Sequence, residues 1–404
     1  MLSASRPAGC SNCSVDRSRK FSACRWDSTA MTAIDRRAFL TASAASCAAW
    51  GLCLPRAVLA AESRCFVSAC SDEDGNTLAR VVTGDGRLLA TLPLPERGHG
   101  AARRPGQREV VVFARRPGRF ALAFDPLSAE PLRRFDAAAG RHFYGHGAFS
   151  PDGRWLFACE NDYDNARGCI GVYDATVGYR REAELESHAI GPHEIVLLSD
   201  GRTLVVANGG IQTHPQAGRR KLNIDSMQPS LAYIDAASGA LLHDHRLPAE
   251  MHQASIRHIA ATANDVIGVA MQYEGPRNNL VPLVGFQHAE AEIVLPPSDA
   301  ATLRSLQQYC GGAAMDASGQ VLAASAPRGG NITFWSVARQ CHLGSLALAD
   351  GCGVAASGAP GGFLASSGYG RLVHHNALSG ETTRLDDPAA APVAWDNHLL
   401  ALTL

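Results

Sequence analysis

Charge is scarce in this sequence. Asp, Glu, Lys and Arg together make up only 19% of the 404 residues, and the formal net charge at pH 7 is −1. A chain so close to neutrality has no overall field that would gather nucleic acid or anionic lipid. Long apolar runs are also missing, because no stretch of about 18 apolar residues follows residue 61. We therefore expect no nucleic-acid partner, and no membrane-spanning helix after residue 61.

Several signatures of enzymes are absent as well. The sequence contains no GxSxG motif for a nucleophilic serine, no HExxH zinc motif and no P-loop for phosphate. It also lacks CxxCH, the motif that attaches c-type haem. These absences favour a binding or accessory protein over a conventional enzyme.

Turn-forming residues, in contrast, are abundant, with 39 glycines and 21 prolines. Turns such as Ser-Pro-Asp-Gly (150–153) and Ser-Asp-Gly (199–201) precede short apolar segments at 154–159 and 203–208. The pattern of four short strands recurs at intervals of roughly 40 to 50 residues, which is typical of a β-propeller. Seven units fit, so the sequence predicts an all-β, seven-bladed β-propeller. The main competing fold, a TIM barrel, needs helices between its strands, and only 298–308 has helical spacing.

The two ends of the chain are expected to share one blade. Strands are predicted at 65–70, 78–83 and 87–92, and this N-terminal group has no innermost strand. The C-terminal stretch 392–404 can supply it. We therefore expect the C-terminal strand to close the ring on the N-terminal blade, which removes the free sheet edges.

The N-terminal region carries an export motif. Residues 35–41 read Asp-Arg-Arg-Ala-Phe-Leu-Thr, and a modest apolar stretch follows. This pattern is typical of a twin-arginine signal peptide, with an amphipathic first helix as the alternative. We assign 1–30 to a mis-called or disordered extension, 31–60 to the signal and 61–404 to a single propeller. The motif predicts a periplasmic location, in an oxidising compartment. There Cys159 and Cys169, which flank a predicted loop, have the opportunity to form a disulfide.

A motif with a central histidine recurs at the predicted start of the innermost strand in four successive units. The copies are Arg-Gly-His-Gly at His99, Tyr-Gly-His-Gly at His146, Gly-Pro-His-Glu at His193 and Ile-Arg-His-Ile at His258. Innermost strands line the central channel of a propeller, so we expect a ring of histidines at the channel mouth. Neutral imidazoles are good ligands for transition metals, and the sequence predicts a metal site for iron or copper.

The later units differ at this position. Cys310 and Cys352 stand where the histidine is expected, and we expect them to complete the ring. His398 lies four residues past the start of the seventh unit and is expected to lie deeper or on another strand. The alternative interpretation is structural: a repeated histidine that only bonds within its own blade would show the same spacing.

Polar loops between the second and third strands are expected on the same face as the histidines. Glu194 and Arg257 adjoin two of the histidines and are expected to orient them from behind. Further rim residues are Glu160, Asp162, His214, Arg219 and Arg328. A mixed acidic and basic rim suits an anionic ligand, a metal complex or a partner protein, although a merely solvated loop is the alternative.

The chain also resembles a known family over nearly all of 65–404. The residues that carry the resemblance include Tyr144-Gly-His-Gly147, Phe149-Ser-Pro-Asp-Gly153, Glu160-Asn-Asp-Tyr163, Ile190-Gly-Pro-His-Glu194, Val206-Ala-Asn-Gly-Gly-Ile211, Ser255-Ile-Arg-His258 and Pro327-Arg-Gly-Gly330. They are similar to a family of uncharacterised, twin-arginine-exported seven-bladed propeller proteins of proteobacteria. Genes of that family tend to lie beside those of imelysin-like lipoproteins and a di-haem peroxidase-like oxidoreductase. The resemblance implies a periplasmic protein connected with iron uptake, and it implies no established activity.

Three hypotheses for function follow. The first is a periplasmic accessory or metal-handling propeller in iron acquisition, partnered by imelysin-like or other iron-uptake proteins. The second is a protein-interaction scaffold without metal. The third is a lactonase-like or oxidoreductase propeller enzyme, which rests on the fold alone.

Overall fold

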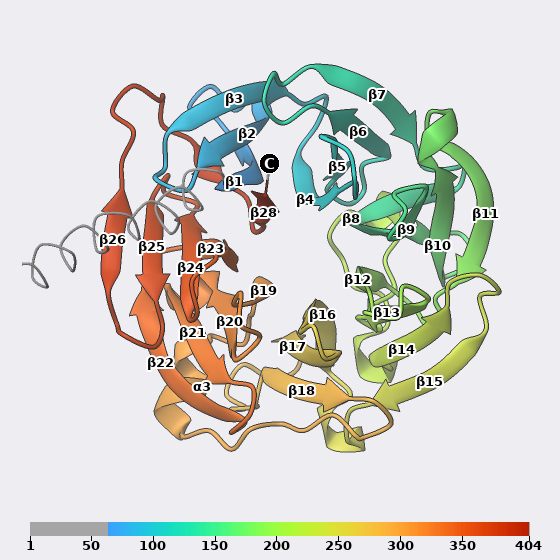
Figure 1. The fold of residues 1–404 in the computed structure, drawn as a ribbon. Helices are drawn as coiled ribbons and strands as arrows, with labels where there is room; N and C mark the ends of the chain where they lie inside the picture. The colour runs from blue at the N-terminus through green and yellow to red at the C-terminus, as the bar shows by residue number, and fades with distance from the viewer. Residues whose placement is uncertain (1–63, 404) are drawn as a thin grey trace, which may run out of the picture. The chain divides into compact units, whose positions relative to one another are not determined.

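Seven antiparallel sheets form a ring around a central axis in the computed structural model, which describes residues 64–403 (Figure 1). The predicted seven-bladed β-propeller is thereby confirmed. The extension and the twin-arginine signal assigned to residues 1–60 lie outside the described residues. Within the described range, no helix is long and apolar enough to span a membrane.

The blades are numbered here in chain order. Blade 1 comprises β1 (Arg64–Ser71), β2 (Thr77–Thr83), β3 (Leu88–Pro93), β27 (Ala394–Trp395) and β28 (Leu400–Thr403). Blade 2 comprises β4 (Gly98–Arg103), β5 (Val110–Ala114), β6 (Phe120–Phe124) and β7 (Pro131–Asp136). Blade 3 comprises β8 (Arg141–Phe149), β9 (Trp155–Asp162), β10 (Arg167–Asp174) and β11 (Arg180–Glu186). Blade 4 comprises β12 (Pro192–Leu197), β13 (Thr203–Asn208), β14 (Ser230–Asp235) and β15 (Leu241–Arg246).

The remaining three blades complete the ring. Blade 5 comprises β16 (Ala254–Ala261), β17 (Val266–Tyr273) and β18 (Val284–His288). Blade 6 comprises β19 (Gly312–Met315), β20 (Val321–Ala326), β21 (Asn331–Ser336) and β22 (Cys341–Ala347). Blade 7 comprises β23 (Gly351–Ala356), β24 (Gly362–Ser367), β25 (Leu372–Asn376) and β26 (Thr382–Leu385).

Strand composition follows position in the blade. The middle strands are mostly buried, and β5 and β6 are apolar and buried along their whole length. Each blade packs between two neighbours, so both faces of a middle strand are covered and the usual alternation of polar and apolar residues disappears. The outer strands β7 and β15 face solvent and are mostly exposed. The hydrophobic core therefore lies between adjacent blades rather than at one centre.

A repeated ion pair stabilises the outer part of three consecutive blades. In each, an aspartate at the end of the third strand accepts a backbone hydrogen bond from its own turn and binds an arginine near the start of the second strand. The pairs are Arg108–Asp125, Arg154–Asp174 and Arg202–Asp235. The acidic turns seen in the sequence thus have a structural role, as caps for the chain reversal.

The ring closes as the sequence predicts. β28 pairs antiparallel with β1, with Cys65 opposite Leu402, and β27 pairs with β1 further along, with Cys70 opposite Trp395. The C-terminal strands thus supply the innermost part of blade 1 (Figure 1). This closure leaves β1 without a free edge.

Blade 5 departs from the predicted four strands. Its sheet has three strands, and only an isolated bridge between Phe286 and Val294 stands where the fourth would begin. Pro296 and Pro297 follow this bridge, and they lack the N–H groups that a continuing ladder needs. The chain then forms the short helix α3 (Ala300–Ser305), inside the segment expected to be helical.

The disulfide that the spacing of Cys159 and Cys169 allows does not form, and all seven cysteines in the described range are free. The register of β9 and β10 gives the reason, since Cys169 lies opposite Glu160 and Cys159 lies opposite Ile170. Side chains alternate between the faces of a sheet, so residues offset by one position point to opposite faces. The sequence spacing allowed a bridge, but the one-residue offset excludes it.

Candidate metal centre

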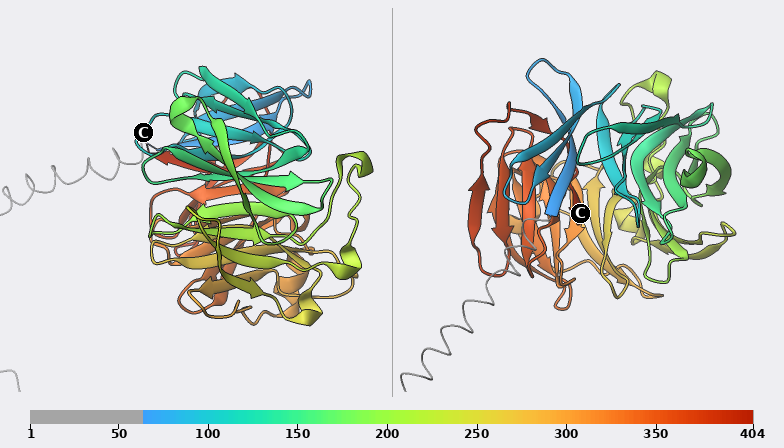
Figure 2. Two further views of the ribbon diagram at one scale, coloured as in Figure 1. Left: turned by 90° about the vertical axis from the view of Figure 1, so that its right-hand side faces the viewer. Right: turned by 45° about the horizontal axis from the view of Figure 1, so that its top comes forward.

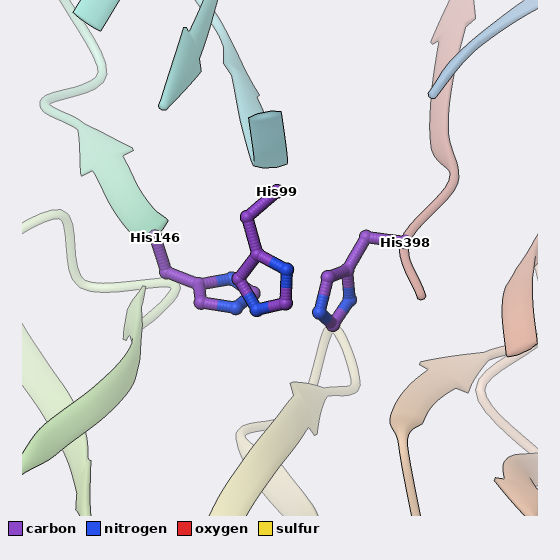
Figure 3. Close-up of side chains that lie close together, drawn as sticks. All are labelled: His99, His146 and His398. Atoms are coloured by element: carbon purple, nitrogen blue, oxygen red, sulfur yellow. The ribbon is translucent and has the colours of Figure 1, made fainter. Parts of the chain in front are cut away.

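Five histidines meet at the axis of the propeller. His99 on β4, His146 on β8, His193 on β12 and His258 on β16 all lie on innermost strands, as predicted. His398, from the segment between β27 and β28, joins them. Eight pairs of these imidazole rings have centroids 4.4 to 5.9 Å apart. The rings of His99, His146 and His398 converge in Figure 3.

A β-bulge aims the side chains at the axis. The register of each of the four innermost strands shifts at the histidine motif: at 98–101 in β4, 143–147 in β8, 192–194 in β12 and 256–258 in β16. An extra residue in one strand bends it and redirects the local side chains. In β16 the extra residue is Arg257, so Arg257 is the structural counterpart of His193. His258 follows the bulge, at the position that Glu194 has in β12.

The glycines of the motif leave space for the rings. A Cβ atom on Gly145 would lie 2.5 Å from Cδ2 of His99, and one on Gly100 would lie 2.9 Å from Nδ1 of His146. Gly145 also has a φ of +105°, a conformation that other residues rarely adopt. The Gly-His-Gly sequences therefore reflect the close approach of histidines from neighbouring blades.

Two carboxylates hold three of the histidines from behind. Nδ1 of His99 lies 3.2 Å from Asp396, in the closing segment. Glu194 serves two rings: its carboxylate oxygens lie 2.9 Å from Nδ1 of His258 and 3.4 Å from Nδ1 of His146. A histidine that donates from Nδ1 to a carboxylate presents Nε2 as the ligand atom, which is the usual arrangement behind a metal site. Glu194 therefore lies where the sequence predicted.

Arg257 also contacts the cluster, but it donates a hydrogen bond to a histidine, whereas Glu194 accepts from the rings. One guanidinium nitrogen lies 2.7 Å from Nε2 of His193, and another donates to the side chain of Gln272 at 3.0 Å. Because a guanidinium only donates hydrogen bonds, Nε2 of His193 is the acceptor and is occupied. His193 thus differs from the carboxylate-backed histidines.

Burial keeps the cluster neutral. It lowers the pKa of His146 to about 3 and holds the pKa values of His193, His258 and His398 well below their usual range. The neighbouring imidazoles and Arg257 act in the same direction. Neutral imidazole is the form that binds metal, so no proton has to leave these rings first.

Three of the imidazoles carry a buried nitrogen without a partner. Nε2 of His146, Nδ1 of His193 and Nε2 of His398 make no hydrogen bond with any group in the described range. Leaving a buried polar atom unpaired costs roughly 1–3 kcal/mol, and native structures rarely do so without a reason. Three such atoms lie in one cluster, and this cluster contains two groups of histidines that are able to hold a metal ion.

The geometry of the cluster fits metal coordination. Ligand nitrogens of His99, His146 and His398 lie within 4.8 Å of one another, and so do those of His146, His193 and His258. Nitrogens bound to one ion at about 2.1 Å are separated by roughly 3.4–4.2 Å, so small side-chain adjustments are sufficient. His146 belongs to both groups.

The two cysteines expected to complete the ring do not join these groups. The thiol of Cys352 lies 3.3 Å from the carbonyl oxygen of Asp396 and 3.6 Å from that of Ser366, and so faces the backbone. Cys310 is buried in the apolar cluster of blades 4 to 6. His398, rather than a cysteine, belongs to one of the two groups of histidines that are able to hold a metal ion.

Two predicted rim residues lie elsewhere. Glu160 is fully buried inside blade 3, where it accepts from Tyr173 and pairs with Arg181 at 2.8 Å. Asp162 is also buried and pairs with Arg141 at 3.0 Å. Glu160 forms a third metal-capable group with Cys169 and Glu184, but arginines already neutralise its carboxylates. We interpret this group as a structural ion-pair network.

The other rim residues lie around one cavity of about 470 Å³ beside the histidines. His214, Arg219, Arg257 and Arg328 line it, as do His99, His193 and His258. His214 comes from the insertion 209–229 between β13 and β14, yellow-green in Figure 2, which contains the short 3-10 helices η2 (Pro215–Ala217) and η3 (Ile224–Ser226). Both its ring nitrogens are occupied, by Asp164 and by the backbone of Gln216.

Sequence reasoning missed Asp396 and did not assign His398 to the site. Both lie in the segment that closes the ring, outside the repeated motif, so repeat spacing gives no signal for them. The only clue was the short Trp-Asp-Asn-His run near the C-terminus, which follows the predicted start of the seventh unit.

Comparison with known proteins agrees with the fold. Residues 92–402 match the model of the family described as Protein of unknown function (DUF1513). None of the curated proteins compared with this chain matches it. Among solved structures, a chain of Kuenenia stuttgartiensis Hydrazine Synthase is similar, with 15% identity and a TM-score of 0.55 over 80% of this chain and 95% of that one. At this identity the likeness concerns the fold alone. The family match spans most of the sequence, and the chain belongs to the DUF1513 family.

Proposed function

We propose that this protein binds a transition-metal ion at the axial histidine cluster and serves as a metal-handling propeller in iron acquisition. The observation that carries the metal proposal is the pair of buried, unpartnered Nε2 atoms of His146 and His398. A purely structural role for the histidines would leave each ring bonded within its blade. Here, the rings face one another across blades instead.

His99, His146 and His398 are the favoured ligands. His99 and His146 are backed by carboxylates, and His398 has a free Nε2. The alternative group contains His193, which is bonded to the guanidinium of Arg257. A cation beside a metal ion raises the cost of binding, because like charges repel in a poorly solvated site.

The chemistry of the ligand atoms also restricts which metal ions the site favours. Neutral nitrogen ligands suit iron, copper and zinc better than the oxygen-loving magnesium and calcium. Glu194 and Asp396 together place two negative charges directly behind the rings, which balances a divalent ion. Iron or copper remains the proposal, and three protein ligands leave a coordination position open.

Location and partners complete the proposal. The twin-arginine motif at 35–41 supports export of the folded protein to the periplasm. The resemblance to exported propellers encoded beside imelysin-like genes supports a role in iron acquisition with an imelysin-like partner. Changing Arg36 and Arg37 to Lys should retain the protein in the cytoplasm, as followed by cell fractionation. An unchanged periplasmic fraction would exclude this route.

Metal titration tests the central part of the proposal. Metal-free protein is titrated with Fe²⁺, Cu²⁺ or Zn²⁺, and binding is measured by calorimetry. We expect His146→Ala and His398→Ala to lose binding, whereas His243→Ala, on the exposed strand β15, should bind as the wild type does. Binding that survives in both cluster variants, or no binding by the wild type, would contradict the proposal.

A further inference from the structure

The cavity beside the histidines is lined by cations and by no carboxylate. Its volume is about 470 Å³, within the range of pockets that hold small organic molecules. The cationic side chains that line it are Arg115, Arg116, Arg219, Lys221, Arg257 and Arg328. None of the residues that line it is Asp or Glu. The sequence suggested a mixed rim, but Glu160 and Asp162 lie inside blade 3.

Only two of these cations are paired with carboxylates in the described range. Arg115 lies 3.5 Å from Asp396, and Lys221 binds Glu274. Arg116, Arg219 and Arg328 form no ion pair with any described residue, and neither does Arg257. Four unpaired guanidinium groups in one concave site repel one another. A bound anion would offset that repulsion.

Arg257 is the most informative of the four, because it is partly buried and contacts the histidine cluster. Its two terminal nitrogens bond to His193 and Gln272, while its Nε is buried without a partner. A buried cation normally has a counter-charge, since desolvation of an isolated charge is costly. No carboxylate in the part of the chain that the structure describes forms an ion pair with Arg257.

Arg328 is positioned from a different blade. It follows β20 in η5 (Pro327–Gly329), and its guanidinium carbon lies 4.7 Å from the ring centroid of Tyr309. This cation–π contact restrains an otherwise exposed side chain near the cavity. Arg116 comes from the turn between β5 and β6, and Arg219 from the insertion in blade 4. Cations from four separate blades therefore converge on one space.

We propose that this cavity binds a small organic oxyanion with two or more carboxylate or phosphate groups, held by Arg116, Arg219, Arg257 and Arg328. Guanidinium groups present parallel N–H donors that match the oxygens of both chemical groups. Tyr144, Ile211 and Tyr309 add apolar surface for a carbon skeleton. This inference goes beyond metal binding and does not depend on it.

Calorimetry on metal-free protein tests the inference separately from the metal site. Citrate, with three carboxylates, and inorganic pyrophosphate, with two phosphate groups, are the probes, in a buffer of low ionic strength and without competing anions. We expect one of them to bind at a single site, and to bind more weakly as salt is added. Citrate binding identifies carboxylates as the preferred groups, and pyrophosphate binding identifies phosphate. Failure of both probes to bind would overturn the proposal.

Matched variants locate the binding. Arg219→Gln combined with Arg328→Gln removes two exposed cations and leaves the core intact, and we expect affinity to fall about tenfold or more. Arg103→Gln, an exposed arginine at the end of β4 outside the cavity, is the control and should bind as the wild type does. Arg257→Gln should cause the largest loss, with circular dichroism to confirm folding. Unchanged affinity in the double variant would overturn the proposal even where Arg257→Gln fails to fold.

Discussion

Glu194 on blade 4 reaches across to blade 5, where one of its carboxylate oxygens lies 2.9 Å from Nδ1 of His258. The same oxygen accepts the backbone N–H of Ile259 at 3.1 Å. Burial raises the pKa of Glu194, while His146 and the bond from Ile259 oppose that rise. One side chain thus fixes the orientation of histidines from two other blades.

This arrangement predicts the effect of removing the charge of Glu194. We expect Glu194→Gln to weaken metal binding by about 10–100-fold, because the ring nitrogens behind the ligand atoms lose their acceptor. Glu186→Gln, on the exposed strand β11, should bind metal as the wild type does. Calorimetric titration measures both. Equal affinities in the two variants would show that Glu194 does not support the site.

The glycine at position 145 gives a second prediction. Gly145→Ala places a Cβ atom 2.5 Å from the ring of His99 in a backbone conformation with φ of +105°. We expect it to lower the free energy of unfolding by about 2 kcal/mol or more and to weaken metal binding. Chemical denaturation and metal titration measure the two effects.

Gly106 supplies the matched control. It has a φ of +69°, and no heavy atom lies within 4 Å of the Cβ position. Gly106→Ala therefore tests backbone strain alone, with an expected cost of about 1 kcal/mol and normal metal binding. A similar cost for both variants would mean that crowding at His99 is unimportant.

The ion pairs of Glu184 in blade 3 lead us to expect that the free energy of unfolding depends on pH. Glu184 is partly buried, which disfavours its charge, but hydrogen bonds from Arg141, Arg181 and Arg167 lower its pKa from 4.5 to about 2. A carboxyl whose pKa is lower in the folded state stabilises it above its unfolded pKa, and that contribution is lost as the pH falls through the folded pKa. The wild type should therefore lose stability between about pH 4.5 and 2.

Glu184→Gln isolates this contribution. The difference in unfolding free energy between wild type and variant should be constant above pH 5 and should shrink as the pH falls towards 2. Urea denaturation across this range measures it. A difference that stays the same at all pH values would show that the ionised carboxylate is not the source.

Closure of the ring gives a fourth prediction. Leu402 on β28 is 1% exposed and packs with the core between blades 1 and 2. We expect Leu402→Ala to cost about 2–4 kcal/mol of unfolding free energy. Leu378→Ala is the control, because that side chain is 57% exposed, and its effect should stay within about 0.5 kcal/mol. If both changes cost the same, the C-terminal strand does not contribute to the core.

The fold was predictable because the repeat is visible in the sequence. Turn signals and apolar strands recur. The pairing of the C-terminal strands with blade 1 was also predicted, because the N-terminal group of strands has no innermost member. Blade 5 was predicted less well. In place of a fourth strand it has one isolated bridge, at Val294, because Pro296 and Pro297 lack the N–H groups that would continue the ladder.

The site was predictable only where it follows the repeat. His99, His146, His193 and His258 were found because equivalent strand positions face the same axis. His398 and Asp396 come from the closing segment, which has no counterpart in the other blades, so their approach is a product of tertiary structure. Hydrophobic patterning likewise does not reveal that Glu160 and Asp162, at the end of β9, are buried. Each is buried because it pairs with an arginine from another strand of blade 3.

Metal content is the measurement that tests the central claim most directly. Untagged protein, purified from its own cells without added metal, is analysed by inductively coupled plasma mass spectrometry beside a His99→Ala/His146→Ala/His398→Ala variant. A site of this kind predicts about one equivalent of iron or copper per chain in the wild type and none in the variant. Negligible metal in both proteins, or equal amounts in both, would contradict a metal centre at the axis of the propeller.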